Sequence, residues 1–319
     1  MADAAPAALR TRHDVWKLPA GDATLDWYGR AVAELKTRPI SDPTSWRYQA
    51  AIHDYHVQTD PSRSPSDQLP ANRAQFWLQC QHGCSYFLPW HRAYLFYFEQ
   101  LIAATVVKLG GPAGWSLPYW NYSDSTNPRA RSLPPGFYQK LPGGGANPLL
   151  VEQRAPGANS GQIIAGEDDV SLNCLRVDHV YYGADDGSGG GFGGAPGNPF
   201  HNGTHPGGLE LTPHGSMHVA VGGSGNTPGW MSSFDTAALD PIFWLHHSNI
   251  DRLWEVWLRR DPSHANPTDS RWRGQSFSFH DSAGAVVSMT PQQVLDATAA
   301  PLSYQYEDVS DPFSSASGA

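Results

Sequence analysis

The sequence predicts a mainly α-helical protein with long irregular loops and a few short strands. Apolar residues recur at helical spacing in several segments, whereas Gly and Pro account for 32 and 27 of the 319 residues. A hydrophobic content of 40% is too high for a disordered chain. Because no change in composition marks a second domain, we expect one domain over 1–319, with its core at about 12–306 and a disordered tail at about 308–319.

The first half of the chain contains three predicted helices. Residues 24–37 have an amphipathic pattern that Pro39 ends, and residues 45–56 suit a second helix. Residues 57–72 are polar and rich in proline, which predicts a loop. Residues 90–108 carry the strongest helical pattern in the chain, and a Gly-Gly-Pro sequence follows as a stop signal.

The second half of the chain is less regular. Residues 141–208 are rich in Gly and Pro and predict mostly irregular structure. Residues 240–258 form another strong helix, in which Asp240 can cap the N-terminus and Pro241 suits the first turn. A few short strands are expected within 270–306.

Net charge excludes several kinds of partner. A formal charge of −9 argues against nucleic acid and against an anionic membrane surface. No stretch is apolar and long enough to span a membrane, and the N-terminal residues lack the pattern of a signal peptide. We therefore expect a cytoplasmic protein, with export alongside a partner left open. Cys80, Cys84 and Cys174 are too few for a disulfide scaffold, although one bridge is arithmetically allowed.

Histidines supply the strongest functional signal. They fall into two groups, His53, His82 and His91, and His214, His218 and His247. His214 and His218 are four residues apart and share one face of a helix. His247 lies on a strongly apolar helix beside His246, and adjacent residues point about 100° apart, so we expect only one of the two to face the site. In the first group His56 competes with His53, one helical turn away.

Six neutral imidazoles can hold a transition metal. Without Cys or carboxylate ligands, the donor set suits Zn, Cu, Fe or Ni. Zinc hydrolase sites usually include a carboxylate or leave a position to water. Two groups of three histidines on a helical scaffold instead predict a symmetric dinuclear site.

Four segments resemble a known family. HGCSYFLPWHRAYLFYFE (82–99) resembles the copper A signature of tyrosinases, catechol oxidases and molluscan haemocyanins, and PYWNYS (118–123) resembles the aromatic segment that follows it. PHGSMHVAVGG (213–223) and DPIFWLHHSNIDRLWEVW (240–257) together resemble the copper B signature. The resemblance covers about 12–306. It implies a central antiparallel four-helix bundle that holds two copper ions.

The resemblance also assigns the ligands. It implies that copper A is bound by His53, His82 and His91, and copper B by His214, His218 and His247. His246 would then be a neighbour that does not bind the metal. The weakest of these assignments is His53, because the loop from His53 to His82 is longer than is usual in the family.

Residues around the ligands match the family as well. Cys80 and His82 have the spacing at which related proteins form a Cys–His thioether, with a free buried thiol as the alternative. Glu210 matches a residue that holds a water near copper B, although a surface carboxylate is the simpler alternative. Phe234 matches an aromatic side chain placed over copper A, although it can equally be a core residue.

Three further positions complete the comparison with the family. Gly215 stands where many strong monophenolases have Asn, which lowers the expectation of monophenol hydroxylation. Asp251 can orient a ligand or pair with Arg252. The sequence Tyr304-Gln305-Tyr306 resembles a tyrosine motif that closes the catalytic domain against an N-terminal arginine such as Arg12. Because the chain ends soon after this motif, no C-terminal shielding domain is expected.

The implied activity is oxidation of o-diphenols to o-quinones with reduction of O2 to water, accompanied by weak monophenol hydroxylation. A small phenol and O2 are the expected partners, and a copper-delivery partner and the oligomeric state are left open. Oxidation of o-aminophenols is one alternative. A haemocyanin-like O2 carrier and a zinc hydrolytic site are others.

Overall fold

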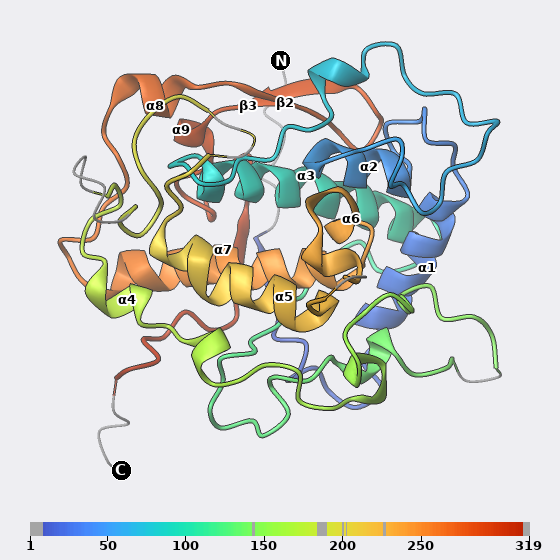
Figure 1. Cartoon of the computed structure of the whole chain (residues 1–319), viewed down its shortest axis with the longest axis horizontal. Helices are drawn as coiled ribbons and strands as arrows, with labels where there is room; N and C mark the ends of the chain where they lie inside the picture. Colours follow the sequence, from blue (N-terminus) through green and yellow to red (C-terminus); the bar gives the residue numbers. More distant parts are fainter. Residues whose placement is uncertain are drawn as a thin grey trace.

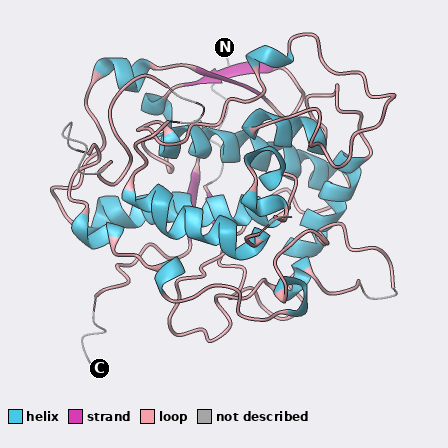
Figure 2. Ribbon diagram, viewed as in Figure 1, coloured by secondary structure: helices cyan, strands magenta, loops and turns pink. Residues whose placement is uncertain are grey.

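The computed structural model describes residues 9–141, 144–183, 190–199, 201, 203–225 and 228–314. Helices dominate, as Figure 2 shows, and the prediction of a mainly helical fold is confirmed. The longer helices are α1 (Thr24–Lys36), α2 (Trp46–His53), α3 (Phe87–Lys108), α5 (Ser216–Gly222) and α7 (Ile242–Arg260). The shorter ones are α4 (Cys174–Val177), α6 (Phe234–Ala237), α8 (Ser270–Gly274) and α9 (Pro291–Val294).

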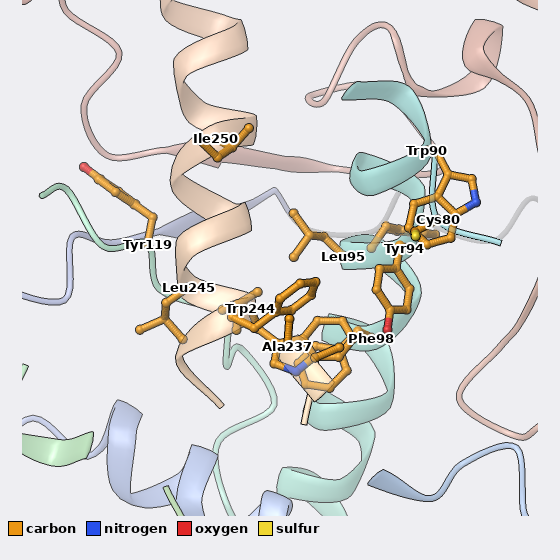
Figure 3. Packing of buried hydrophobic residues seen from close by; sticks show 14 of the residues in the cluster. Cys80, Trp90, Tyr94, Leu95, Phe98, Tyr119, Ala237, Trp244, Leu245 and Ile250 are labelled. Carbon is orange, nitrogen blue, oxygen red and sulfur yellow. The ribbon is translucent and has the colours of Figure 1, made fainter. Parts of the chain in front are cut away.

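Helices α3 and α7 form the centre of the molecule and run in opposite directions (Figure 1). Their packing depends on large aromatic side chains, which bury much apolar surface. The rings of Phe98 and Trp244 are stacked, with centroids 3.4 Å apart and planes within 7° of parallel (Figure 3). The Tyr94 ring lies 4.7 Å from the same tryptophan. Two of the predicted histidine-bearing helices are therefore fixed against each other.

The remaining helices enclose this pair. Helix α1 packs against α3 and α2, and α2 contacts α6. Helix α5 crosses in front of α7 in Figure 1 and follows directly on a wide helical turn, Glu210–Gly215, that is interrupted by the extended backbone of Thr212. The described residues between 141 and 208 add only α4 and the 3₁₀ turns Ala158–Ser160 and Asp168–Val170, as the sequence predicts.

Several helix boundaries differ from the prediction. Helix α7 begins and ends two residues later than predicted, so Pro241 lies just before the helix, although the Asp240 side chain still accepts from the N–H of Ile242. Helix α2 ends at His53 rather than at residue 56, because Asp54 has an extended backbone, with φ −155° and ψ 155°. At its other end the Ser45 side chain accepts a hydrogen bond from the N–H of Tyr48. Helix α3 begins at Phe87, three residues before the predicted start, which places Pro89 in its first turn.

The strands among the described residues form two small sheets of two strands each. β2 (Phe277–His280) pairs antiparallel with β3 (Val286–Met289), as expected for 270–306. β1 (Arg10–Arg12) pairs parallel with β4 (Tyr304–Tyr306), so the two ends of the described chain meet in one small sheet.

A buried ionic cluster ties this sheet to the central helices. It comprises Arg12, Arg92, Glu99, Asp251, Tyr304 and Tyr306 and is called the Arg12–Asp251 cluster below. Arg12 forms an ion pair of 2.6 Å with Glu99, and its Nη1 donates to the Tyr306 hydroxyl at 2.8 Å. The expected contact between Arg12 and the tyrosine motif is thus confirmed.

No helix among the described residues is long and apolar enough to cross a membrane. The predicted tail is in part held against the body of the protein, since Arg260 pairs with Asp311 and the Arg252 side chain donates to the Asp308 carbonyl. Residues 315–319 of that tail lie outside the described residues.

Candidate metal centre

The first histidine group gathers side chains from two helices and a loop. His53 is the last residue of α2, His91 lies in the first turns of α3, and His82 precedes α3. One ring nitrogen from each of the three lies within 4.8 Å of the others, and all three side chains are buried. Gly83 permits the sharp turn after His82, because its φ is +61° and a Cβ there would lie 2.2 Å from the Gly203 carbonyl oxygen.

The second group lies on the wide turn before α5, on α5 itself and on α7. It contains four histidines whose ring nitrogens also lie within 4.8 Å of one another: His214, His218, His246 and His247. The two groups adjoin, since the rings of His91 and His247 are stacked at 4.5 Å and those of His82 and His214 lie 5.9 Å apart.

Backbone carbonyls orient four of the rings. Each Nδ1 must donate, because a carbonyl oxygen can only accept. The four bonds run from His53 to Phe234 O at 2.9 Å, from His91 to Phe87 O at 2.8 Å, from His214 to Glu210 O at 3.0 Å and from His218 to Met231 O at 2.7 Å. In all four rings the tautomer is therefore fixed with a lone pair on Nε2, the arrangement usual for metal-binding histidines.

Three of these lone pairs have no partner among the described residues. Nε2 of His53, His91 and His214 is buried and makes no hydrogen bond within the described residues. The Nε2 atoms of His218 and His247 face each other at 3.4 Å. Buried polar nitrogens are ordinarily satisfied, and leaving one unsatisfied costs about 1–3 kcal/mol. Their convergence fits a pair of imidazole-bound transition metal ions, and neither group includes a carboxylate.

The pKa values of the histidines also favour metal binding. Burial lowers the pKa of His53 to about 3 and that of His218 to about 4. Burial, followed by the charges of neighbouring imidazoles, holds the pKa of His82, His91 and His247 well below the usual value. The rings are consequently neutral at physiological pH, as metal binding requires.

His53, rather than His56, lies with the first group. The His56 side chain is 58% exposed and its Nε2 lies 3.5 Å from Asp54 Oδ1. Because α2 ends at His53, His56 no longer follows it on the same helical face.

The expectation that only one of His246 and His247 faces the site is wrong, since both contribute ring nitrogens to the second group. Their rings point in different directions within it: His247 stacks on His91 of the first group, whereas His246 lies between His214 and Tyr122. Only His247 therefore spans both groups, and its assignment as the ligand stays a prediction.

Phe234 and Glu210 both lie beside the histidines. The Phe234 ring is 4.8 Å from that of His82 and 6.3 Å from that of His53, and it is 45% exposed. Glu210 is buried and not a surface carboxylate; its Oε1 accepts from the Gly83 N–H at 2.7 Å, while Oε2 is buried without a partner. Burial raises the pKa of Glu210 to about 8, opposed by N–H donors of Gly83 and Gly207.

Cys80 makes a contact that the sequence did not suggest. Its Sγ lies 3.2 Å from Nδ1 of His201, on a loop far away in sequence. Nε2 of His201 in turn lies 3.5 Å from Asp54 Oδ2. The structure holds Cys80 as a buried thiol, and the thioether with His82 stays a prediction.

Two phenylalanines in the centre were missed. Phe87 packs 4.7 Å from both His91 and His214, and Phe243 packs 4.2 Å from His247 and 5.0 Å from His53. Each precedes a predicted ligand by four residues on its helix, and this spacing is the signal by which they can be found.

Asp251 does not pair with Arg252, contrary to one of the two expectations for it. Its carboxylate binds Arg92 and the hydroxyls of Tyr304 and Tyr306 in the Arg12–Asp251 cluster. Arg252 donates instead to Asn249 and Asn121.

A cavity of 190 Å³ opens beside the second group. Its walls include His214, Gly215, His218, Val219 and Phe234. Gly215 adds no side chain to this wall.

Comparisons with known proteins identify the sequence pattern. Residues 43–260 match the family model described as the common central domain of tyrosinase, and residues 266–317 match the polyphenol oxidase middle domain. Tyrosinase HcTyr1 of Hahella sp. (strain CCB-MM4) is 40% identical over 90% of this chain and 61% of its own length. A chloroplastic polyphenol oxidase of Malus domestica is 28% identical over 97% of this chain and 50% of its own. The chain thus spans about half to three fifths of the length of these relatives.

Solved structures agree with the fold. A latent apple tyrosinase superposes with a TM-score of 0.71 at 27% identity, covering 97% of this chain and 65% of that one. A Grenache (Vitis vinifera) polyphenol oxidase gives a TM-score of 0.71 at 24% identity, over 97% of this chain and 87% of that one, which supports the fold alone.

Proposed function

The chain belongs to the tyrosinase family, and from this premise we propose that it is a dicopper oxidase that converts o-diphenols to o-quinones while O2 is reduced to water. Hydroxylation of monophenols is a weak second activity. The observation that carries the proposal is the convergence of two histidine groups in which the buried Nε2 atoms of His53, His91 and His214 have no partner among the described residues.

Six histidines are the proposed ligands. His53, His82 and His91 would hold one copper, and His214, His218 and His247 the other. Bound copper supplies the binding of O2 and the transfer of electrons. The protein supplies rigid rings, because carbonyl acceptors on four separate segments fix the Nδ1–H groups and so aim the opposite nitrogens.

The cavity beside His214 and His218 would bind the phenol ring. Phe234 lies at its wall, where an aromatic face can contact a substrate ring. Access of this kind favours an oxidase over an O2 carrier, which needs no cavity for an organic molecule.

Glu210 is the proposed proton acceptor. Its Oε2 is buried without a partner, while the bond from Gly83 N–H to Oε1 fixes the carboxylate. Oε2 can accept a proton from the bound phenol, directly or through a water. Because Gly215 offers no polar side chain beside His214, nothing at that position assists deprotonation of a monophenol, and we expect diphenols to be the better substrates.

The test is a comparison of substrates on copper-loaded protein. Catechol should be oxidised rapidly, 4-substituted phenols slowly and after a lag, and o-aminophenols at an intermediate rate. Rapid tyrosine turnover without a lag would contradict the preference for diphenols. Reversible O2 binding without catechol consumption would contradict the oxidase itself in favour of an O2 carrier.

A further inference from the structure

A second, larger cavity adjoins the proposed substrate cavity. It has a volume of 660 Å³, and its walls include Pro156, Ile164 and Asp169. Gly215 and Val219 line both cavities. The two cavities therefore share part of their wall, at the residue that follows His214.

At Gly215 no side chain stands in the wall that the two cavities share. A Cβ added there would meet only the Glu210 carbonyl oxygen, at 3.4 Å, and nothing else within 4 Å. The backbone of Gly215 has φ −61° and ψ −40°, which suits any residue, so a turn does not require glycine here. The missing side chain consequently leaves space there for a ring substituent.

Asp169 gives the second cavity its charge. It is the only carboxylate among the described residues that line either cavity. Its Oδ2 accepts from the Gly166 N–H at 2.7 Å, which orients the side chain in the 3₁₀ turn Asp168–Val170. No described hydrogen bond involves Oδ1, so this oxygen is available to a ligand.

We propose that this protein prefers o-diphenols whose ring carries a short chain ending in an ammonium group. The ring occupies the cavity beside His214, the chain crosses Gly215 and contacts Val219 and Ile164, and the ammonium pairs with Asp169. The inference rests on the proposed oxidase function and names its substrate class. A formal net charge of −9 favours approach of a cation over that of an anion.

The expected preference is modest, because Asp169 is partly exposed and the ion pair is screened by water. Pairs of this kind change affinity by a factor of about 2–5. The effect should fall as ionic strength rises, since salt screens partly exposed charges.

The experiment uses the copper-loaded full chain at low ionic strength. The probes are catechol, 4-methylcatechol, dopamine and 3-(3,4-dihydroxyphenyl)propionate, which differ in the charge of the ring substituent. The proposal predicts that kcat/KM is higher for dopamine than for the propionate, by more than the reactivity of the two rings explains. The difference should lie mainly in KM. Asp169→Asn should lower the ratio of the two kcat/KM values about 2–5-fold. Asp168→Asn, an exposed neighbour that lines neither cavity, is the matched control and should leave the ratio unchanged.

A second variant tests the route. Gly215→Leu places a side chain at the shared wall and should raise the KM of dopamine more than that of catechol. The inference is overturned if catechol is oxidised but Asp169→Asn and Asp168→Asn give the same ratio. It is also overturned if 0.5 M salt leaves the ratio of the unmodified protein unchanged, because the screening length is already about 10 Å at roughly 0.1 M salt. Failure to oxidise catechol at all would instead overturn the proposed function.

Discussion

Two groups of buried polar side chains share the helices α3 and α7 but satisfy their polar atoms in opposite ways. His91 and Arg92 are neighbours on α3, and His247 and Asp251 lie one turn apart on α7. In the Arg12–Asp251 cluster, guanidinium, carboxylate and hydroxyl groups bind one another. In the histidine groups, Nε2 atoms converge, and those of His53, His91 and His214 have no partner among the described residues.

The difference separates a structural site from a binding site. A closed set of partners ties strands and helices together and has no capacity for a ligand. An open set leaves each unsatisfied nitrogen at a cost of about 1–3 kcal/mol, which the fold retains because a bound metal removes it. Substitution in the two regions should therefore change different properties of the protein.

The largest expected effect is on activity. His214→Ala removes a proposed ligand and should lower catechol oxidation by several orders of magnitude, because the electrons pass through the metal pair. The metal-free protein should lose little stability, because removal of the unsatisfied ring nitrogen offsets the loss of the packing that the ring made. Steady-state assays and urea unfolding of the metal-free protein measure the two effects. His56→Ala, on the exposed histidine outside the group, is the control and should keep full activity.

The next largest effect is on stability. Asp251→Asn leaves Arg92 and Arg12 short of a counter-charge and should lower the free energy of unfolding by about 3–5 kcal/mol in the metal-free protein. Asp26→Asn breaks an exposed ion pair with Arg30 on α1 and should cost less than about 0.5 kcal/mol. Urea unfolding measures both variants. Equal losses from the two would remove the distinction between the cluster and an ordinary surface ion pair.

Glu210→Gln tests a residue that shares features of both regions, since one of its carboxylate oxygens is satisfied and the other is not. Oε1 is satisfied by Gly83, whereas Oε2 is not. The amide keeps the shape and the acceptor oxygen but loses the base, so kcat should fall about 100-fold while copper content is unchanged. Loss of copper in this variant would show that Glu210 acts through the ligands instead of as a proton acceptor.

The smallest effect concerns a lone unsatisfied atom. Asp14 is buried, its Oδ2 has no partner in the part of the chain that the structure describes, and burial raises its pKa to about 6. The folded state thus prefers the protonated form, and stability present below pH about 4 is lost as the pH rises through about 6. Asp14→Asn should stabilise the protein by about 1–2 kcal/mol at pH 7.5 and by almost nothing at pH 4. Thermal unfolding at both pH values measures this, and a gain at pH 4 equal to that at pH 7.5 would contradict it.

The sequence predicted the helices and most of the histidines because both depend on local spacing. The apolar pattern of α3 and α7, and the four-residue step from His214 to His218, are visible without a structure. The end of α2 depends on the backbone of Asp54, which the helical pattern of 45–56 does not reveal.

Long-range contacts were harder to foresee. His201 reaches Cys80 from a loop about 120 residues later, and Asp251 selects Arg12 and Arg92 over the adjacent Arg252. The angular separation of adjacent helix residues suggested that His246 points away, yet α5 and the preceding turn wrap around α7 far enough for both rings to reach His214 and His218. Contacts of this kind depend on how distant segments pack, and no local sequence pattern predicts that packing.

The most direct test of the central claim is the metal content of the copper-reconstituted full chain and of two variants, one from each histidine group. We predict two copper ions per chain in the unmodified protein, and about one in both His91→Ala and His214→Ala, because each group holds its own ion. A single metal per chain, two zinc ions retained in preference to copper, or variants that keep both coppers would contradict the assignment of two three-histidine sites.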